Sequence, residues 1–145
     1  MHKITLTYED FNGEEVTEDL YFNLTKAELL EMNFHAKGGL VNYIESIMNA
    51  RDIEEIANFF KYILIKSYGE KTPDGKHFMK TPEIEQNFQC SIPYSELYTK
   101  LSTDADAAAS FINAVIPKDI IEQYKKAESE GKIPEELKER MKPLS

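Results

Sequence analysis

The stretch GEKTPDGK, residues 69–76, is closest in form to a site for chemistry, because glycine-rich loops that end in lysine can hold phosphate groups. That motif requires four residues between its glycines and Ser or Thr after the lysine. Here five residues separate Gly69 from Gly75, and His77 follows Lys76. We therefore reject a nucleotide site at this position.

Metal and nucleophilic sites are not indicated either. The histidines, His2, His35 and His77, are scattered, and none has a second ligand at metal-binding spacing. The single cysteine, Cys90, cannot form an internal disulfide, and its place in a predicted helix favours a small core residue over a nucleophile. We expect no catalytic residue, no cofactor and no metal. An enzyme is the weakest alternative, which a co-purifying metal or cofactor would revive.

The grouped acidic residues have structural explanations. Asp104 and Asp106 stand at a predicted helix start, where the helix dipole favours negative charge. The four acids between residues 14 and 19 belong to a predicted strand, and we interpret them as its solvated face and not as a metal site.

Composition and charge limit the kinds of partner. The chain of 145 residues has the length of one domain, with 41% hydrophobic and 30% charged residues, as in soluble globular proteins. No apolar run approaches the roughly 20 residues that cross a bilayer, and the N-terminus does not have the form of an export signal, so we expect a cytoplasmic protein. The net charge is −9, and no basic stripe is present. These features argue against nucleic acid or an anionic membrane as the main partner and favour a protein, of basic character.

An N-terminal β-hairpin is predicted first. Residues 2–8 alternate between apolar and polar types, Asn12-Gly13 is a turn signal, and a second strand returns over about residues 15–23. Two strands leave exposed edges with which another subunit can pair, so we expect the hairpin to mediate self-association.

A central helix is predicted over Asp52–Tyr68, capped by Asp52. Its apolar side chains cover most of its circumference and leave only a narrow polar seam, so other helices should pack around it. Gly69 is expected to end it. The stripe formed by Ala105, Ala108 and Ala109 in the last core helix is expected to pack closely on it.

The other helices are predicted from caps and periodicity, and together they give a bundle of about six. Thr25 begins a helix that reaches about Phe34, and another runs from Leu40 to about Met48. A third begins at Pro82, with Thr81 as its N-cap, and a fourth begins at Pro93. The last helix begins at Thr103-Asp104 and reaches Ile116. A turn at Pro73-Asp74-Gly75 indicates a small β-excursion near residues 71–80.

The predicted fold class is therefore α+β and mainly helical. We divide the chain at Pro117 into a globular domain, 1–117, and a charged, partly helical, mobile C-terminal tail, 118–145, which we expect to be mobile from about residue 126. The domain consists of the hairpin, 2–23, and the helical body, 25–117. Ile120, Ile121 and Tyr124 are expected to continue one amphipathic turn against it.

Two stretches then resemble a known family. The sequences IKSYGEKTPDGKHFMKTPEI, residues 65–84, and YSELYTKLSTDADAAASFINAVIP, residues 94–117, are similar to the tail assembly chaperones of long, non-contractile-tailed phages and prophages. The matching features are a Lys-x-Tyr-Gly helix end, a polar Asp-Gly hairpin, a Tyr-x-x-Leu helix and a final helix that ends at Ile-Pro. They are structural and not catalytic.

The resemblance implies a function and its partners. Such chaperones bind the tape measure protein, a long helical chain that sets tail length, and keep it soluble in the host bacterial cytoplasm until tube subunits displace them. It also implies self-association, contact with the major tail tube protein, and a longer form made by ribosomal frameshifting. The alternative is an acidic binding module, an anti-repressor or nucleic-acid mimic, which a clustered acidic face would favour. The sequence does not identify the residues that bind the partner.

Overall fold

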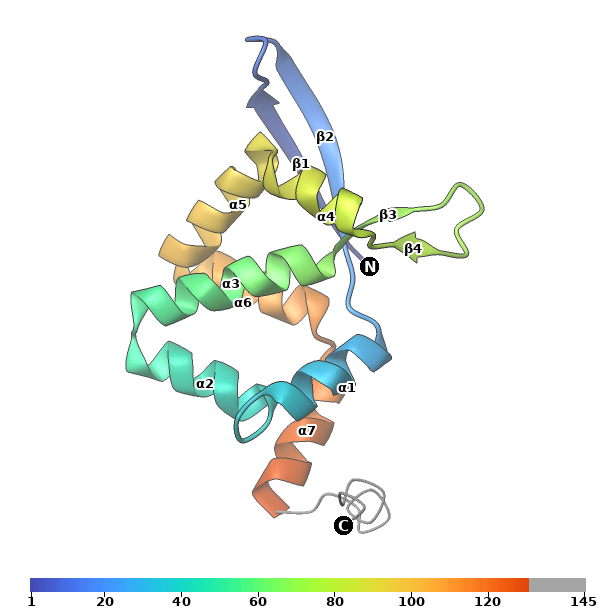
Figure 1. Ribbon diagram of the computed structural model, residues 1–145. Helices are drawn as coiled ribbons and strands as arrows, with labels where there is room; N and C mark the ends of the chain where they lie inside the picture. Colours follow the sequence, from blue (N-terminus) through green and yellow to red (C-terminus); the bar gives the residue numbers. More distant parts are fainter. Residues whose placement is uncertain (131–145) are drawn as a thin grey trace.

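The structure is a computed structural model in which residues 1–130 are described (Figure 1). As predicted, it is α+β and mainly helical, with an N-terminal hairpin and a small β-excursion. Among these residues there are seven helices: six correspond to the predicted bundle, and the seventh, α7, lies in the predicted tail. The strands are β1 (His2–Glu9), β2 (Glu15–Phe22), β3 (Tyr68–Lys71) and β4 (Phe78–Met79). The helices are α1 (Lys26–His35), α2 (Leu40–Ala50), α3 (Ile53–Ser67), α4 (Pro82–Gln89), α5 (Ile92–Thr103), α6 (Ala105–Val115) and α7 (Lys118–Glu130).

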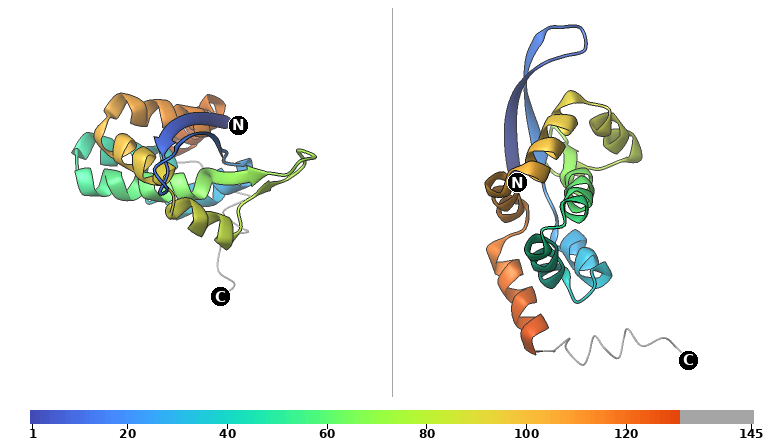
Figure 2. Two further views of the ribbon diagram at one scale, coloured as in Figure 1. Left: turned by 90° about the horizontal axis from the view of Figure 1, so that it is seen from above. Right: turned by 90° about the vertical axis from the view of Figure 1, so that its left-hand side faces the viewer.

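The predicted hairpin is confirmed, and its register is continuous from His2 opposite Phe22 to Glu9 opposite Glu15. At its tip, the Asp10 N–H donates to the Glu14 carbonyl oxygen at 2.8 Å. Gly13 adopts a φ of +81°, which glycine reaches without steric cost. The hairpin extends well beyond the helices (Figures 1 and 2).

The β-excursion is larger than predicted, because it continues the sheet. The sheet order is β1-β2-β3-β4, and Tyr21 and Phe22 pair with Gly69 and Tyr68. The prediction that Tyr68 belongs to the central helix and that Gly69 ends it is therefore wrong: α3 ends at Ser67 and both residues lie in β3. Pairing with a distant strand draws them out of the helix. A Cβ on Gly69 would lie 2.6 Å from a ring carbon of Phe78, so this strand pair requires a residue without a side chain.

Side chains begin the helices where the sequence predicted caps. Thr25 forms both hydrogen bonds of a capping box with Glu28, and Asp52, Thr81 and Asp104 each accept a hydrogen bond from the first turn that follows. Helix α2 continues to Ala50, two residues beyond its predicted end. Helix α5 begins with Ser91 as its cap, a role that the sequence analysis did not assign.

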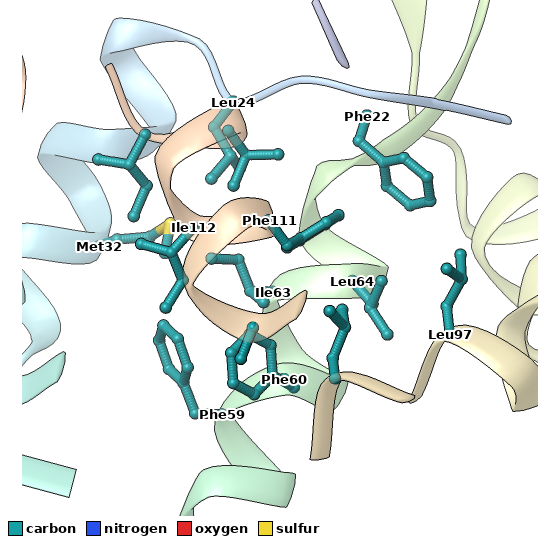
Figure 3. Close-up of a cluster of buried hydrophobic side chains, with 14 of the residues drawn as sticks. Phe22, Leu24, Met32, Phe59, Phe60, Ile63, Leu64, Leu97, Phe111 and Ile112 are labelled. Carbon is teal, nitrogen blue, oxygen red and sulfur yellow. The ribbon is translucent and has the colours of Figure 1, made fainter. Parts of the chain in front are cut away.

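The core gathers around α3, as predicted. Phe60, Ile63 and Leu64 are completely buried and lie in one cluster with Phe22, Leu97 and Phe111 from other elements, together with further apolar residues (Figure 3). The apolar surface of α3 is nevertheless incomplete. Ile53 is 72% exposed at the first turn, and Tyr62 is 49% exposed, so the expectation that other helices cover the apolar side chains of this helix is wrong at these two positions.

Two other core assignments are corrected. The alanine stripe does not pack on α3 as a whole: only Ala108 is buried, while Ala105 and Ala109 are exposed. The larger Phe111 of α6 contributes to the core beside α3 instead (Figure 3). Cys90 is also not a core residue. It is exposed at the C-terminal end of α4.

The base of the hairpin enters this core through aromatic contacts. Phe22, at the end of β2, has its ring centroid 5.7 Å from that of Tyr68, 5.9 Å from that of Phe88 and 5.4 Å from that of Phe111. Tyr68 and Phe88 also stack at 4.0 Å. These contacts fix one end of the hairpin, and the other end projects freely.

Helix α7 follows Pro117, where we predicted a boundary. Its Ile120 is buried, and Ile121 and Tyr124 pack against the core, as expected for this turn. The helix continues to Glu130, past the residue near 126 from which we expected mobility, and residues 131–145 lie outside the described part of the chain. The division into a domain and a tail stays a prediction.

Candidate binding groove

An open apolar groove lies where α1, the α1–α2 loop, α2 and α3 meet. Its volume is about 490 Å³. The residues that line it are Met32, His35, Ala36, Lys37, Leu40, Tyr43, Asn58, Phe59 and Tyr62. Figure 1 shows that α1 and α2 lie on the side of α3 away from the hairpin.

Local hydrogen bonds set the angle between α1 and α2 and thereby shape one wall. The side-chain oxygen of Asn33 accepts the Leu40 N–H at 2.8 Å, so α1 caps the start of α2. The Gly39 N–H donates to the Ala36 carbonyl oxygen at 3.0 Å, and Gly39 has a φ of +95°. Since few residues other than glycine adopt that φ, the tight connection depends on this position.

The groove has an apolar floor and a mixed rim. Met32, Leu40 and Phe59 form the buried floor, and Phe59 meets Tyr43 edge to face with ring centroids 6.0 Å apart. The exposed Tyr62 lies at the rim. A surface of this kind binds an apolar group and excludes water from it, with polar atoms available only at the edges.

The polar lining residues carry no negative charge. They are His35 and Lys37 from the end of α1 and the loop, and Asn58 from α3, together with the tyrosine hydroxyls. Among residues 1–130 no carboxylate lines the groove, although the chain has a net charge of −9. The groove thus differs from the acidic character of the chain as a whole, and it does not match the basic partner that the overall charge suggested.

A second apolar surface lies on the outer side of α1. Leu30 and Phe34 are 42% and 46% exposed and stand one helical turn apart. Helical spacing places them away from Met32 and Ala36, which face the groove. α1 therefore presents apolar side chains on two sides.

The residues that first suggested chemistry are not brought together. His2 lies against Phe111, with ring centroids 6.0 Å apart, and burial lowers its pKa. His35 lies at the groove, and His77 is in the exposed β3–β4 loop. Within residues 1–130, no group of three or more His, Cys, Asp or Glu is placed to hold a metal ion.

The stretch 69–76 forms a tight turn that uses its own polar groups. The Thr72 hydroxyl donates to the Asp74 carboxylate at 2.6 Å, and the Lys76 N–H donates to the same oxygen at 3.0 Å. These bonds lower the pKa of Asp74. The polar atoms of the loop thus hold the turn itself.

The groove was not predicted from the sequence. Its lining comes from three helices and a loop, and each apolar residue reads as core when its own helix is considered alone. The one local signal is the position of Tyr62 in α3. It follows Lys61 directly and lies one helical turn after Asn58, and both of these residues belong to the polar seam of the helix. An aromatic residue at the border of a polar seam is consistent with an exposed rim position.

Comparison with known proteins gives one positive finding. A family model described as phage tail assembly chaperone matches residues 1–143. No curated protein and no solved structure matches the chain. None of the helices within residues 1–130 has the length and apolar character needed to cross a membrane.

Proposed function

The chain belongs to the phage tail assembly chaperone family, and we propose that its client is the tape measure protein, which it keeps soluble until the tail tube forms around it. The proposed place of action is the cytoplasm of the bacterial host. The major tail tube protein is the proposed second partner, because its polymerisation must displace the chaperone. The protein acts by binding alone, without catalysis, nucleic acid or membrane.

The observation that carries this proposal is the groove between α1, α2 and α3. A long helical chain presents apolar side chains at spacings of three and four residues, and these aggregate when they are left bare. The buried floor of Met32, Leu40 and Phe59 offers such side chains a dry surface. Tyr43 and Tyr62 at the edges supply both apolar area and hydroxyls.

Weak individual contacts suit a chaperone that must later be displaced. Many copies along one client chain bind with avidity, because each bound copy raises the effective concentration of the next contact. The net charge of −9 keeps the loaded complex dissolved, since like-charged copies repel non-specific collapse. Release by the polymerising tube then requires breaking only one small contact at a time.

The positions of the acids give little support to the alternative of an acidic mimic. Asp52 and Asp104 cap helices, and Glu28 pairs with Lys80. Such positions serve the fold locally. The hairpin has the densest acidic stretch, residues 9–19, and two of the carboxylates there accept hydrogen bonds from side chains of β1.

Co-expression with a tape measure fragment tests the proposal. The wild-type chain should keep the fragment in the supernatant and co-elute with it. Tyr62→Glu, which places a charge at the groove, should abolish both effects. Ile53→Glu is the matched control, because it adds the same charge to an exposed apolar position of α3 that does not line the groove.

Two results would contradict parts of the proposal. If the fragment is equally insoluble with and without the wild-type chain, the client is wrong. If Tyr62→Glu and Ile53→Glu both retain the fragment in solution, the client binds elsewhere, and the outer surface formed by Leu30 and Phe34 becomes the next candidate.

A further inference from the structure

The strand β1 forms an open edge of the sheet. It pairs with β2 along its whole length, and within residues 1–130 no strand pairs with its other side. Toward its turn the hairpin extends beyond the helices, whereas one face of β1 packs against the core through Ile4 and Leu6 (Figures 1 and 2). An open edge of eight residues is a template for a further strand, because its unpaired N–H and C=O groups point outward.

The register within the hairpin shows which residues direct their backbone groups outward. Asp10 and Glu14 form the hydrogen-bonded pair that closes the hairpin, and such pairs alternate along an antiparallel ladder. The even-numbered residues of β1 therefore bond to β2. The odd-numbered residues present their N–H and C=O groups to the open edge, and these are Lys3, Thr5, Thr7 and Glu9.

We propose that the strand taken up by this edge is β1 of a second copy, paired antiparallel about a two-fold axis at Leu6. In this register Lys3 of each copy lies opposite Glu9 of the other, and Thr5 lies opposite Thr7. On the other face, Ile4 lies opposite Tyr8 and Leu6 opposite Leu6. The proposal concerns a different surface from the client groove and does not depend on it.

Charge selects this register. In this register Lys3 of each copy lies opposite the Glu9 carboxylate of the other copy, which gives two ion pairs. Cross-strand pairs of opposite charge stabilise a sheet. A shift by two residues in one direction moves Lys3 opposite Thr7. A shift in the other direction moves it past Glu9 to the turn at Phe11, so both shifts lose the ion pairs.

The same register relieves a repulsion within the hairpin. Glu9 and Glu15 lie directly opposite each other on the exposed face, where like charges destabilise the pair. Lys3 of the second copy would stand on the other side of Glu9 and offset that charge. Across the combined sheet, Glu15 of β2, Glu9 of β1 and Lys3 of the second copy would then be neighbours in one row.

Exposed apolar residues at both ends of β1 support the arrangement. Phe11, at the turn, is 84% exposed, and Met1 is 63% exposed. If the register is extended past the pair of Glu9 and Lys3 by two residues, to the next pair on the same face, Phe11 of one copy lies next to Met1 of the other. Two side chains that are costly to leave in water would thereby cover each other.

A proline pair tests the edge. Thr7→Pro removes an outward N–H and should abolish self-association. Thr17→Pro is the matched control: Thr17 lies directly opposite Thr7, so proline there costs the hairpin the same contact, but its N–H points away from β1. Sedimentation velocity over a concentration series should show association for the wild type and Thr17→Pro only. A wild-type chain that stays monomeric throughout, or Thr7→Pro that associates like Thr17→Pro, overturns the proposal.

A charge exchange tests the register, and it does not rely on a variant that endangers folding. Lys3→Glu and Glu9→Lys should each raise the dissociation constant about tenfold, because both ion pairs become repulsive. Mixing the two variants should restore association, since positions 3 and 9 are then both acidic in one copy and both basic in the other. Single variants that associate normally, or a mixture that associates no better than either one alone, would overturn the register. Client binding in the co-expression assay is expected to persist in Thr7→Pro, so failure of one proposal leaves the other standing.

Discussion

The hairpin and the helical body differ in how far they bury their apolar side chains. Along β1 every second side chain is half-buried and none is fully buried, whereas α3 places Phe60, Ile63 and Leu64 completely inside. Strand pairing holds the outer part of the hairpin, and apolar packing from several elements holds the body and the base of the hairpin. A surface made by pairing can be exposed at a strand edge without loss of stability, so the hairpin is free to bind while the body maintains the fold.

The contrast also exists within the hairpin. Leu20 and Phe22, at its base, are 2% and 0% exposed, while Val16, nearer the tip, is only half-buried and Phe11 is almost fully in water. The Tyr8 hydroxyl donates to the Glu18 carboxylate, which raises the pKa of Tyr8 to about 12. The tip is thus held by its own cross-strand bonds, and the base by the core.

The largest effect is expected in the body. Phe60→Ala removes a completely buried ring from the centre of the core and should lower the free energy of unfolding by about 3–5 kcal/mol. Urea denaturation followed by circular dichroism measures it. Leu30→Ala, at a 42% exposed position, is the control and should cost far less. Equal losses from the two substitutions would contradict a core centred on α3.

The junction between the two regions should show the next largest effect. At Gly69 an added Cβ would lie 2.6 Å from a ring carbon of Phe78 and 2.9 Å from the Met79 carbonyl oxygen. Gly69→Ala should therefore cost about 1–3 kcal/mol, because backbone must move to admit it. Gly75→Ala tests the same change where the Cβ meets open space, although at a φ of +73°. If Gly69→Ala proves the milder of the two, β4 does not approach as closely as described.

An ion pair ties the start of α1 to the chain that leaves β4. The Lys80 ammonium donates to both Glu28 carboxylate oxygens, at 2.8 and 2.7 Å, and to the Asn23 carbonyl oxygen at 2.6 Å. Burial opposes ionisation of Glu28, but hydrogen bonds from Lys80 and Thr25 outweigh it and lower the pKa of this carboxyl. Burial lowers the pKa of Lys80, because the loss of hydration outweighs the hydrogen bonds and the negative charge of Glu28, which raise it.

Breaking this pair should have an intermediate effect. Lys80→Met leaves Glu28 partly buried without its cation and should cost about 1–2 kcal/mol, less than for a fully buried pair, because both side chains retain some exposure. Lys80→Met with Glu28→Gln should cost less than the sum of the two single changes. Strict additivity would show that the pair contributes nothing.

The pH dependence follows from the lowered pKa of Glu28. A depressed carboxyl pKa stabilises the folded state above the unfolded pKa, and this stabilisation is lost as the pH falls through the folded pKa. Glu28→Gln should therefore show a smaller loss of stability than the wild type on acidification below the ordinary carboxyl range. An unchanged acid profile would contradict the assignment.

Features that depend on residues close together in the sequence could be predicted, and contacts between residues far apart in the sequence could not. The hairpin turn and the caps at Thr25, Asp52, Thr81 and Asp104 depend on residues within a few positions of one another, so their patterns are visible in the chain. The pairing of Gly69 with Tyr21 and the bond from Lys80 to Glu28 join residues about 50 positions apart and have no local signature. The groove belongs to this second kind, because a side chain such as Phe59 serves as core and as binding surface at once.

The smallest effect on stability is expected at the hairpin tip. Phe11 is 84% exposed and contacts little of its own chain, so Phe11→Ser should change the free energy of unfolding by less than about 0.5 kcal/mol. The same substitution should weaken self-association, because the two-fold register of β1 covers this ring with Met1 of the second copy. Urea denaturation at a concentration where the chain is monomeric measures the first quantity, and sedimentation measures the second. A large loss of monomer stability would mean that the tip folds back on the body, and the contrast between a packed body and a free hairpin would then fail.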